Sequence, residues 1–417
     1  MKFLRRASGR TFQSLHVRNF RLYFIGQGIS ISGTWMQSLA QGYLVVAVLH
    51  GSAVDLGVTV ALPFLPMLLL GPLGGVLVDR SDKRNVLFAT QTVAGLLALC
   101  LGILVSTGGV TLGAIWTMAA ILGLVNLLDN PARQSFVQEM VGRELLPNAV
   151  ALNSALINIG RVLGPAISAV LLATVSVAAC FYVNAASYAA VIVALALMRT
   201  SEITRIRTVE RATGQVRAGF RYVWGVPEIR ETLLAVAVVG MFAFNFTVTL
   251  PLLVLKTLHG SPAAYAFVTC SFGFGAVLGG LVVAHRARPT RSLLVALSGV
   301  FALSMSTVAV APTVWAAALL AVPMGAASIA FLSSANALLQ LRSREEMRGR
   351  VMSLYAMAFL GTTPIGAIVI SLITSASNVR VAIGVGAFSI LAAGTYLWLT
   401  SRERAPATVS PAAGAAA

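Results

Sequence analysis

Leu73-Gly-Gly-Val-Leu-Val-Asp-Arg80 and Leu278-Gly-Gly-Leu-Val-Val-Ala-His285 are two versions of one stretch, 205 residues apart, and each closes an apolar run. A second pair supports the same spacing, because Ser154 to Pro165 parallels Ser353 to Pro364 at an offset of 199. Six apolar runs separate the members of each pair. A repeat of this length indicates a duplicated structural unit. The sequence therefore predicts two similar halves with six apolar segments each.

The composition places these segments in a membrane. Hydrophobic residues make up 58% of the 417 residues and charged residues only 10%, against roughly 25% charged residues in soluble domains. Runs of about 20 apolar residues are long enough to cross a hydrocarbon core of ~30 Å. We expect an all-α membrane protein of about twelve transmembrane helices. The expected spans are 22–49, 54–78, 86–106, 112–132, 149–174, 178–198, 232–255, 263–284, 292–311, 313–338, 351–374 and 379–400.

The net charge of +17 reports orientation. Nearly all Lys and Arg residues fall in the two tails and in the alternate loops that share one side, and only Lys256 and Arg380 fall in the opposite loops. Cytoplasmic loops carry this excess of positive charge. We therefore expect a multi-pass protein of the bacterial inner membrane with both termini in the cytoplasm. The basic side attracts anionic lipid headgroups, and nucleic acid is not expected as a partner.

Four regions follow from this topology. Residues 1–198 form the first half with a basic tail at 1–21, and 231–400 form the second half. The linker 199–230 contains an amphipathic stretch at 214–224, in which Val216, Phe220, Val223 and Trp224 share one face, as in a helix that lies at a membrane surface. Residues 401–417 are rich in Ala, Pro and Gly, and we expect them to be disordered.

The loop after the second span carries a motif. Gly75-Val-Leu-Val-Asp79-Arg80-Ser-Asp82-Lys83-Arg84 resembles the loop motif of the major facilitator superfamily, with Asp82 where that motif usually has Gly. The resemblance implies the major facilitator fold, in which two six-helix halves hold a substrate between them. It also implies a gating role for Gly75, Asp79, Arg80, Lys83 and Arg84. A solvated charge cluster that only sets the topology is the alternative.

A second resemblance is narrower. The block that contains Asp129-Asn-Pro-Ala-Arg133-Gln134, Arg143-Glu144, Asn148 to Ser154 and Gly160-Arg-Val-Leu-Gly164-Pro165 looks like the enterobactin-exporter-like branch, which includes drug exporters. Gly160, Gly164 and Pro165 resemble part of the antiporter motif, although Ser168 and Ala169 replace its final glycines. The resemblance implies a secondary active exporter of amphipathic drug-like or siderophore-like molecules, which works by proton antiport and alternating access.

Three charged residues are candidates for energy coupling. Asp129 and Arg133 lie four residues apart on one helix face. Asp129 is the one acid that we place within a span, since Asp55 stands at the edge of the second span. Ionisable groups inside a membrane are costly and point to function. Asp129 could carry a coupling proton, or it could form a structural pair with Arg133 or Arg161. Arg161, within the fifth span, could bind an anionic group of the substrate or pair with Asp129.

Polar residues inside spans are candidates for the substrate cavity. Gln27, Ser30, Thr34, Gln37 and Gln41 recur at helical spacing in the first span. In a membrane such a stripe lines a cavity or packs on a partner helix through hydrogen bonds. Further candidates are Asn126, Asn158 and, among phenylalanines, Asn245.

Enzyme chemistry and cofactors are not expected. The sequence contains no ATP-binding loop and no paired carboxylates for hydrolysis, and the four histidines and three cysteines lack the spacing of metal ligands. The expected partners are a small-molecule substrate, protons and membrane lipid, and the protein is expected to be a monomer. Two other functions stay open, namely an importer or facilitator of a small metabolite and a non-transporting membrane scaffold or sensor.

Overall fold

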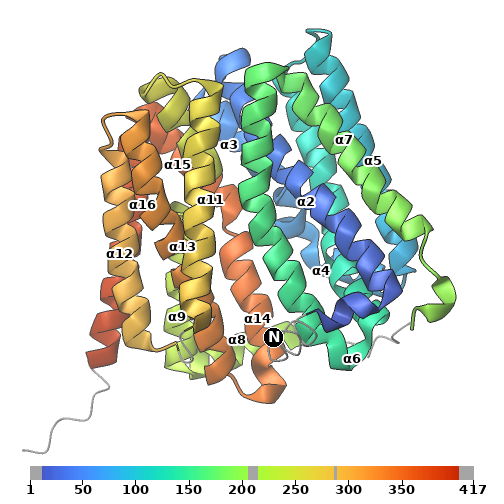
Figure 1. The fold of residues 1–417 in the computed structure, drawn as a ribbon. Coiled ribbons are helices and arrows are strands. Elements are labelled where there is room, and N and C mark those ends of the chain that lie inside the picture. Colours follow the sequence, from blue (N-terminus) through green and yellow to red (C-terminus); the bar gives the residue numbers. More distant parts are fainter. Residues whose placement is uncertain (1–11, 205–214, 286–288, 403–417) are drawn as a thin grey trace, which may run out of the picture.

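Helices account for nearly all of the chain that the computed structural model describes, namely residues 12–204, 215–285 and 289–402 (Figure 1). The first half contains η1 (Gln13–His16), α2 (Arg18–Tyr43), η2 (Leu44–Val48), α3 (Ala53–Ala61), α4 (Leu65–Asp79), α5 (Lys83–Ser106), α6 (Leu112–Thr174), α7 (Val177–Ala196) and η3 (Thr200–Glu202). The second part contains α8 (Gln215–Gly225), α9 (Pro227–Phe242), α10 (Phe246–Pro251), η4 (Leu252–Thr257), α11 (Pro262–His285), α12 (Arg291–Ala309), α13 (Val314–Arg342), α14 (Glu345–Leu360), α15 (Thr363–Ala376) and α16 (Val379–Arg402).

The number of membrane crossings agrees with the expected twelve. Ten helical segments of the described chain are long and apolar enough to span a membrane. One of them, α6, contains two crossings because the backbone leaves the helical conformation at Gly142, where φ is 71°. The helix α2 is not among the ten, since its polar stripe dilutes its apolar sequence. With α2 and the second crossing of α6, the chain crosses twelve times.

Three crossings are broken in the middle. Span 2 consists of α3 and α4, span 7 of α9, α10 and η4, and span 11 of α14 and α15. Proline explains two of the breaks, because Pro66 and Pro364 each stand in the first turn of the second piece. A proline tolerates the start of a helix but disrupts its interior. These breaks divide α3 from α4, and α14 from α15. The two pieces of each crossing can therefore pack on different helices.

Short capped turns join the helices at the end of the bundle that lies opposite Arg84 and Arg291. The Ser52 hydroxyl accepts a hydrogen bond from the Asp55 amide at 3.2 Å, within a capping box that opens α3. Thr111, Ser176 and Thr313 cap α6, α7 and α13 in the same way. Hydroxyls at this position satisfy amides that have no partner in the first helical turn.

The helices α9 and α14 begin five or more residues earlier than expected, both at the end of the bundle where α5, α9 and α12 start, which we call the basic end. The helix α9 starts at Pro227 instead of residue 232, and α14 starts at Glu345 instead of residue 351. The difference places Glu231 inside the seventh crossing with a relative exposure of 1%. The expectation that Asp129 is the one acid within a span is therefore wrong. Charged residues lower the local hydropathy, but the helices continue through them.

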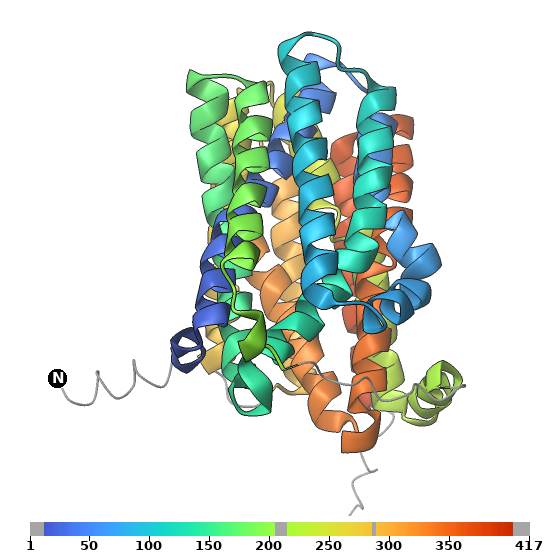
Figure 2. The same cartoon turned by 90° about the vertical axis from the view of Figure 1, so that its right-hand side faces the viewer.

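The linker helix α8 lies across the basic end (Figures 1 and 2). Its Val223 is buried in a small cluster with Ile229, Leu339 and Val351, whereas Phe220 and Trp224 are 41% and 59% exposed. Val223 therefore packs on the second half, whereas Phe220 and Trp224 face outward. The start of the expected stretch at Gly214 and the tail at 403–417 lie outside the described residues.

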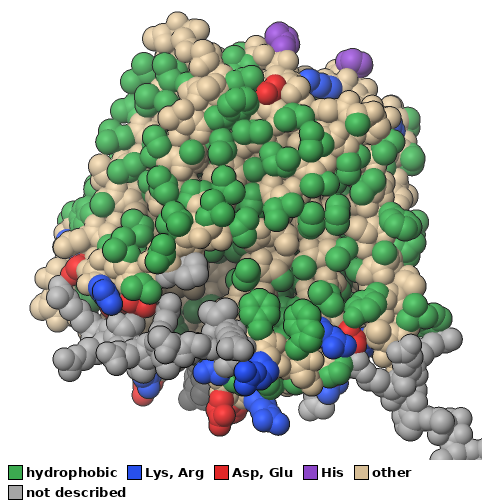
Figure 3. Space-filling model, turned by 180° about the vertical axis from the view of Figure 1, so that it is seen from behind, with side chains coloured by type: hydrophobic (Ala, Val, Ile, Leu, Met, Phe, Trp, Pro, Cys, Tyr) green, Lys and Arg blue, Asp and Glu red, His purple; other side chains and the backbone are tan. Residues whose placement is uncertain are grey.

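The surface agrees with a membrane setting. On the face in Figure 3, hydrophobic side chains cover much of the middle of the molecule, most charged side chains lie at the lower edge, and histidine side chains lie at the top. Contiguous apolar surface of this size is unusual for soluble proteins. The band has the arrangement expected where lipid tails meet the protein and headgroups meet the charged rims.

The halves contact each other at the end opposite the basic end and, through α6 and α11, near the middle of the bundle. A Cβ atom added to Gly57 in α3 would lie 2.2 Å from Ser371 Oγ in α15, and Lys256 Nζ donates to the Gly51 carbonyl at 2.6 Å. At the basic end, α4 packs mainly on α6, and α14 packs on α9, α8 and α13. Each of these two helices therefore packs chiefly within its own half at the basic end.

Candidate functional site

Asp129 lies at the centre of a buried polar cluster in the first half. It forms an ion pair with Arg133, one turn further along α6. Two residues of α5 also donate to its Oδ1 atom, Thr90 through Oγ1 at 2.7 Å and Gln91 through Nε2 at 2.8 Å. Asp129 is 5% exposed. Buried carboxylates need such partners, and these link α6 to α5. The spacing of Asp129 and Arg133 predicts their pairing, whereas Thr90 and Gln91 were not among the candidates.

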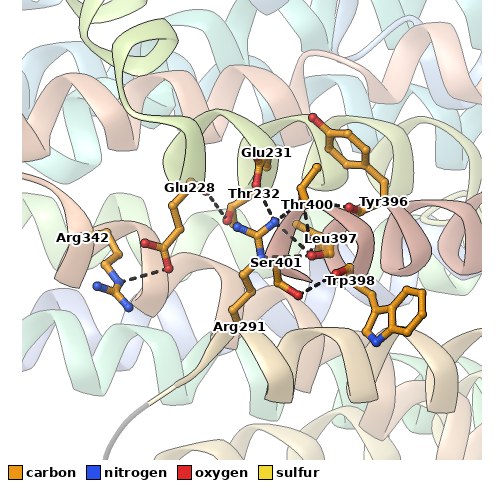
Figure 4. A network of polar contacts seen from close by, with 10 residues as sticks. All are labelled: Glu228, Glu231, Thr232, Arg291, Arg342, Tyr396, Leu397, Trp398, Thr400 and Ser401. Carbon is orange, nitrogen blue, oxygen red and sulfur yellow. Dashed lines mark hydrogen bonds and ion pairs between the residues drawn. The ribbon is translucent and has the colours of Figure 1, made fainter. Parts of the chain in front are cut away.

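A second buried acid lies in the other half (Figure 4). Glu231 of α9 forms an ion pair with Arg291 at the start of α12. Arg291 also donates to the Leu397 carbonyl of α16, from Nε at 3.1 Å and from Nη2 at 3.0 Å, and to the Thr400 hydroxyl. One arginine thus joins α9, α12 and α16. This cluster was not among the expected sites, because Glu231 lies just outside the expected seventh span, 232–255.

The gating motif lies at the turn between α4 and α5. Lys83 Nζ donates to the carbonyls of Asp79 and Ser81, each at 3.1 Å. Arg84 Nε donates to the Leu195 carbonyl at the end of α7 at 2.9 Å. Gly75 and Asp79 are half-buried and Arg80 is exposed. The contact of Arg84 repeats that of Arg291, since both join the start of one helix to the end of the last helix of the same half.

Arg161 differs from Arg133 and Arg291, which are half-buried as it is. Its guanidinium carbon lies 5.2 Å from the centre of the Trp35 ring of α2. Its Nε atom is buried and has no hydrogen-bond partner, and no carboxylate of the described residues forms an ion pair with it. Asp129 pairs with Arg133 instead, so the alternative pairing of Asp129 with Arg161 is not formed in this structure.

The polar stripe of the first span does not lie on one open surface. Gln27 and Ser30 are buried, and the Thr34 hydroxyl donates to the Ser30 carbonyl at 3.0 Å. Gln37 accepts a hydrogen bond from Asn184 Nδ2 of α7 at 2.6 Å. Part of the stripe therefore packs on a neighbouring helix, which was one of the two expected arrangements. Gln41 is half-buried, and its role in a cavity stays a prediction.

The remaining amides are split between the two halves. Asn126 is half-buried in α6, and Asn158 donates to the Ser154 carbonyl at 3.0 Å. Asn245 is 2% exposed and donates to the Met241 carbonyl at 2.7 Å, but its Oδ1 atom has no partner in the described chain. It lies at the break between α9 and α10. A buried acceptor without a donor is costly, which keeps Asn245 among the candidates for contact with a substrate or water.

The antiporter-like glycines pack α6 on α2. A Cβ atom added to Gly160 would lie 2.5 Å from Ile31 Cγ2, and one added to Gly164 would lie 2.5 Å from Trp35 Cβ. Small residues of this kind allow two membrane helices to approach closely. Pro165, the last residue of the motif, is buried inside α6. The contact explains why larger residues do not fit at these two positions; an antiport role stays a prediction.

Comparison with known proteins identifies the family. A family model described as transmembrane secretion effector matches residues 9–411. The chain is 26% identical over 395 residues to the enterobactin exporter EntS of Citrobacter koseri, with 92% of each chain covered. It is 24% identical to the multidrug efflux pump Tap of Mycolicibacterium fortuitum, with 79% of this chain and 83% of that protein covered.

A solved structure supports the fold. The nucleoside transporter NupG superposes with a TM-score of 0.72 and 12% sequence identity, and the match covers 92% of this chain and 99% of that chain. Identity at this level speaks for the fold alone. The matched family and the relatives consist of membrane transporters. The chain therefore belongs to the transmembrane secretion effector family of the major facilitator superfamily, and it is a multi-pass membrane transporter, not an enzyme.

Proposed function

We propose that the protein is a secondary active exporter of amphipathic small molecules in the bacterial inner membrane, driven by proton antiport with alternating access. The relatives named as exporters support the direction of transport. The observation that carries the coupling is the Asp129 cluster, a buried acid whose cationic partner Arg133 lies on the same helix. Both members of this ion pair belong to α6. Protonation of Asp129 would therefore break the pair without separating two helices.

The basic end faces the cytoplasm in this proposal. It carries Arg84 and Arg291, and the positive-inside rule places such residues on the cytoplasmic side. The exposed Phe220 and Trp224 of α8 then lie at the inner headgroup layer, where aromatic residues are favoured. Both termini are cytoplasmic, and one chain is sufficient to form the transport path.

Alternating access follows from the distribution of contacts between the halves. The halves meet at the outer end through Lys256 with Gly51 and through Gly57 with Ser371. Substrate enters from the cytoplasm in this arrangement. Export then requires the outer contacts to separate, while the region of Asp79 and Arg84 approaches the second half. Asp129 releases its proton inward and takes up another when the outer side opens.

The energy of one proton is sufficient for useful export. Moving one elementary charge across 100 mV yields about 2.3 kcal/mol, which corresponds to a concentration ratio of roughly 50-fold. A single titrating group therefore meets the requirement. A facilitator without coupling would only equalise concentrations, and this difference makes the two functions separable in one assay.

The test is an accumulation assay in an efflux-deficient bacterial host. Retention of dyes, macrolides and catecholates is followed with and without an uncoupler, for the wild type, Asp79→Asn and Asp129→Asn. Uncoupler-sensitive loss of a compound that both substitutions reduce is the expected result. Net uptake by the wild type would establish an importer instead. No effect on any compound, with insertion in the membrane confirmed, would favour the scaffold or sensor function.

A further inference from the structure

The guanidinium of Arg161 forms no ion pair with a carboxylate of the described residues. Arg133 and Arg291, which are half-buried as Arg161 is, pair with Asp129 and Glu231. Arg161 has the Trp35 ring as its neighbour, a buried Nε without a partner, and no carboxylate of the described chain within ion-pair distance. A cation at this position is expensive unless a partner balances it. The arrangement indicates a partner that does not belong to the protein.

Arg161 lies at the seam between the two halves. The Arg161 carbonyl is so close to α11 that a Cβ atom on Gly273 would lie 2.9 Å from it. One residue further along, the Val162 carbonyl accepts a weak hydrogen bond from Cys270 at 3.7 Å. The side chain of Arg161 thus comes from the first half, at the level where the second half touches it. A ligand bound there contacts both halves.

Depth in the membrane limits the kind of ligand. Arg161 stands thirteen residues before Thr174, the end of α6, which is about 20 Å along the helix axis. The crossing is roughly 30 Å deep, so Arg161 lies about 20 Å from the outer headgroup layer and about 10 Å from the inner one. A lipid phosphate stays at the surface of the bilayer. A molecule that enters the bundle between the halves reaches the depth of Arg161 directly.

An aromatic surface begins beside the same seam. Phe272 follows Cys270 in α11, next to Gly273, and its ring centre lies 4.5 Å from that of Phe246. Phe246 contacts Phe244 at 5.4 Å, and Phe244 contacts Phe359 at 5.0 Å. All four rings are half-buried. The second half therefore presents rings at the depth at which the first half presents a cation.

We propose that Arg161 is the binding residue for an anionic group of the transported molecule, and that the substrates are organic anions with a flat apolar body. The anion binds the guanidinium beside Trp35, and the apolar body lies against Phe246 and Phe272. Arginine suits carboxylate and related planar anions because its donors form a fork. The proposal rests on the proposed function, since it assigns a substrate class to the same path between the halves.

The experiment compares three probes of equal shape and different charge. Purified full-length protein in lipid nanodiscs is titrated with 2-naphthoate, with neutral 2-naphthamide and with cationic 2-naphthylmethylamine, and binding is measured calorimetrically. The variants are Arg161→Met, Arg161→Lys and, as a control, Arg143→Met, which removes an exposed arginine. A hydrogen bond between charged groups stabilises a complex more than one to a neutral group does. We therefore expect the wild type to bind naphthoate at least ~10-fold more tightly than the amide.

The variants then locate the preference. Arg161→Met abolishes the preference for the anion, Arg161→Lys keeps part of it, and Arg143→Met leaves it unchanged. Equal or tighter binding of the neutral or cationic probe by the wild type overturns the proposal, as does unchanged naphthoate binding by Arg161→Met. If Arg161→Met does not fold, the wild-type series and Arg161→Lys still decide.

A separate measurement distinguishes this inference from the proposed function. Uncoupler-sensitive export in cells tests coupled transport and does not depend on which charge the substrate carries. Export of some compound together with a preference for neutral or cationic probes would retain the function and remove Arg161 as the anion site. A clear anion preference that depends on Arg161, without any uncoupler-sensitive export, would retain the site and remove the exporter.

Discussion

Each half of the molecule buries acidic side chains, and Asp129 in the first half and Glu231 in the second have different surroundings. Asp129 pairs with Arg133 of its own helix and receives further donors from one neighbour, α5. Glu231 pairs across helices with Arg291, and that arginine also holds α16. The side chains of Asp129 and Arg133 are 7% and 21% exposed, whereas those of Glu231 and Arg291 are 1% and 13% exposed.

The two ion pairs differ in the helices that they join. Loss of the Glu231 charge leaves Arg291, which contacts α9 and α16, without its counter-ion, so this pair stabilises the second half. Loss of the Asp129 charge changes a pair within one helix, which keeps its backbone hydrogen bonds in either state. We expect stability to depend on Glu231 and transport to depend on Asp129.

The largest expected effect is on stability. Glu231→Gln removes the charge that balances Arg291, and breaking a buried ion pair costs about 3–5 kcal/mol. We expect a large fall in the apparent melting temperature of the detergent-solubilised protein, measured by size-exclusion chromatography after heating.

The matched control lies one turn earlier on the same helix. Glu228 pairs with Arg342 at 3.1 Å, with side-chain exposures of 24% and 58%, and exposed pairs contribute about 0–1 kcal/mol. Glu228→Gln should therefore leave the melting temperature nearly unchanged. If both variants lost the same amount of melting temperature, the burial of Glu231 would not explain its contribution to stability.

The next effect is on coupling. Asp129→Asn keeps the shape of the side chain and an acceptor for Thr90 and Gln91, but it removes the carboxylate to which we assign the coupling. We expect the uncoupler-sensitive concentration ratio to fall from as much as ~50-fold to about one. The ratio is measured in cells with a compound that the wild type exports, at matched amounts of protein in the membrane.

Stability is measured in the same preparation, because the comparison requires both quantities. Asp129→Asn should lose less stability than Glu231→Gln, and Glu231→Gln should keep a residual uncoupler-sensitive gradient at a permissive temperature. A wild-type gradient in Asp129→Asn assigns the coupling to another group. A stability loss as large as that of Glu231→Gln would show that the Asp129 cluster stabilises the fold as the Glu231 pair does.

The fold could be predicted because the bilayer imposes a length. Apolar runs of about 20 residues, repeated in two halves, leave few alternatives. The boundaries at the basic end were wrong for Glu231 and Glu345, where helices continue beyond the apolar run into charged sequence. Hydropathy indicates where a segment leaves the lipid. The helix itself ends where the series of backbone hydrogen bonds between residues four apart ends.

The site was predictable only where contacts are local. The pairing of Asp129 with Arg133 follows from a spacing of four residues on one helix. Arg291 lies 60 residues from Glu231, and Arg161 lies 126 residues from Trp35. Those contacts depend on which helices become neighbours and on their rotation. The periodicity of a single helix shows neither of these. The sequence therefore left two partners open for Arg161, Asp129 and a substrate anion, and only the structure shows that Asp129 pairs with Arg133 instead.

The smallest expected effect extends the comparison to the outer end. Lys256 and Arg380 are the two cations there, and both donate to backbone carbonyls. Lys256 binds Gly51 across the halves at 2.6 Å, whereas Arg380 binds Ala309 and Ala311 within the second half, each at 2.9 Å. Lys256→Met should weaken the closed outer side by about 1 kcal/mol, or roughly 5-fold in the conformational equilibrium. Arg380→Met should lower stability without this shift.

Cys270 provides the readout, because it lies at the seam where its thiol contacts the Val162 carbonyl. In a background with Cys100→Ala and Cys180→Ala, a thiol reagent added from outside should modify Cys270 about 5-fold faster in Lys256→Met and at the wild-type rate in Arg380→Met. Faster modification in both variants would mean that the outer end opens through general loosening of the bundle. A difference between them means that contacts between the halves, and not contacts within one half, set the access of the site from outside.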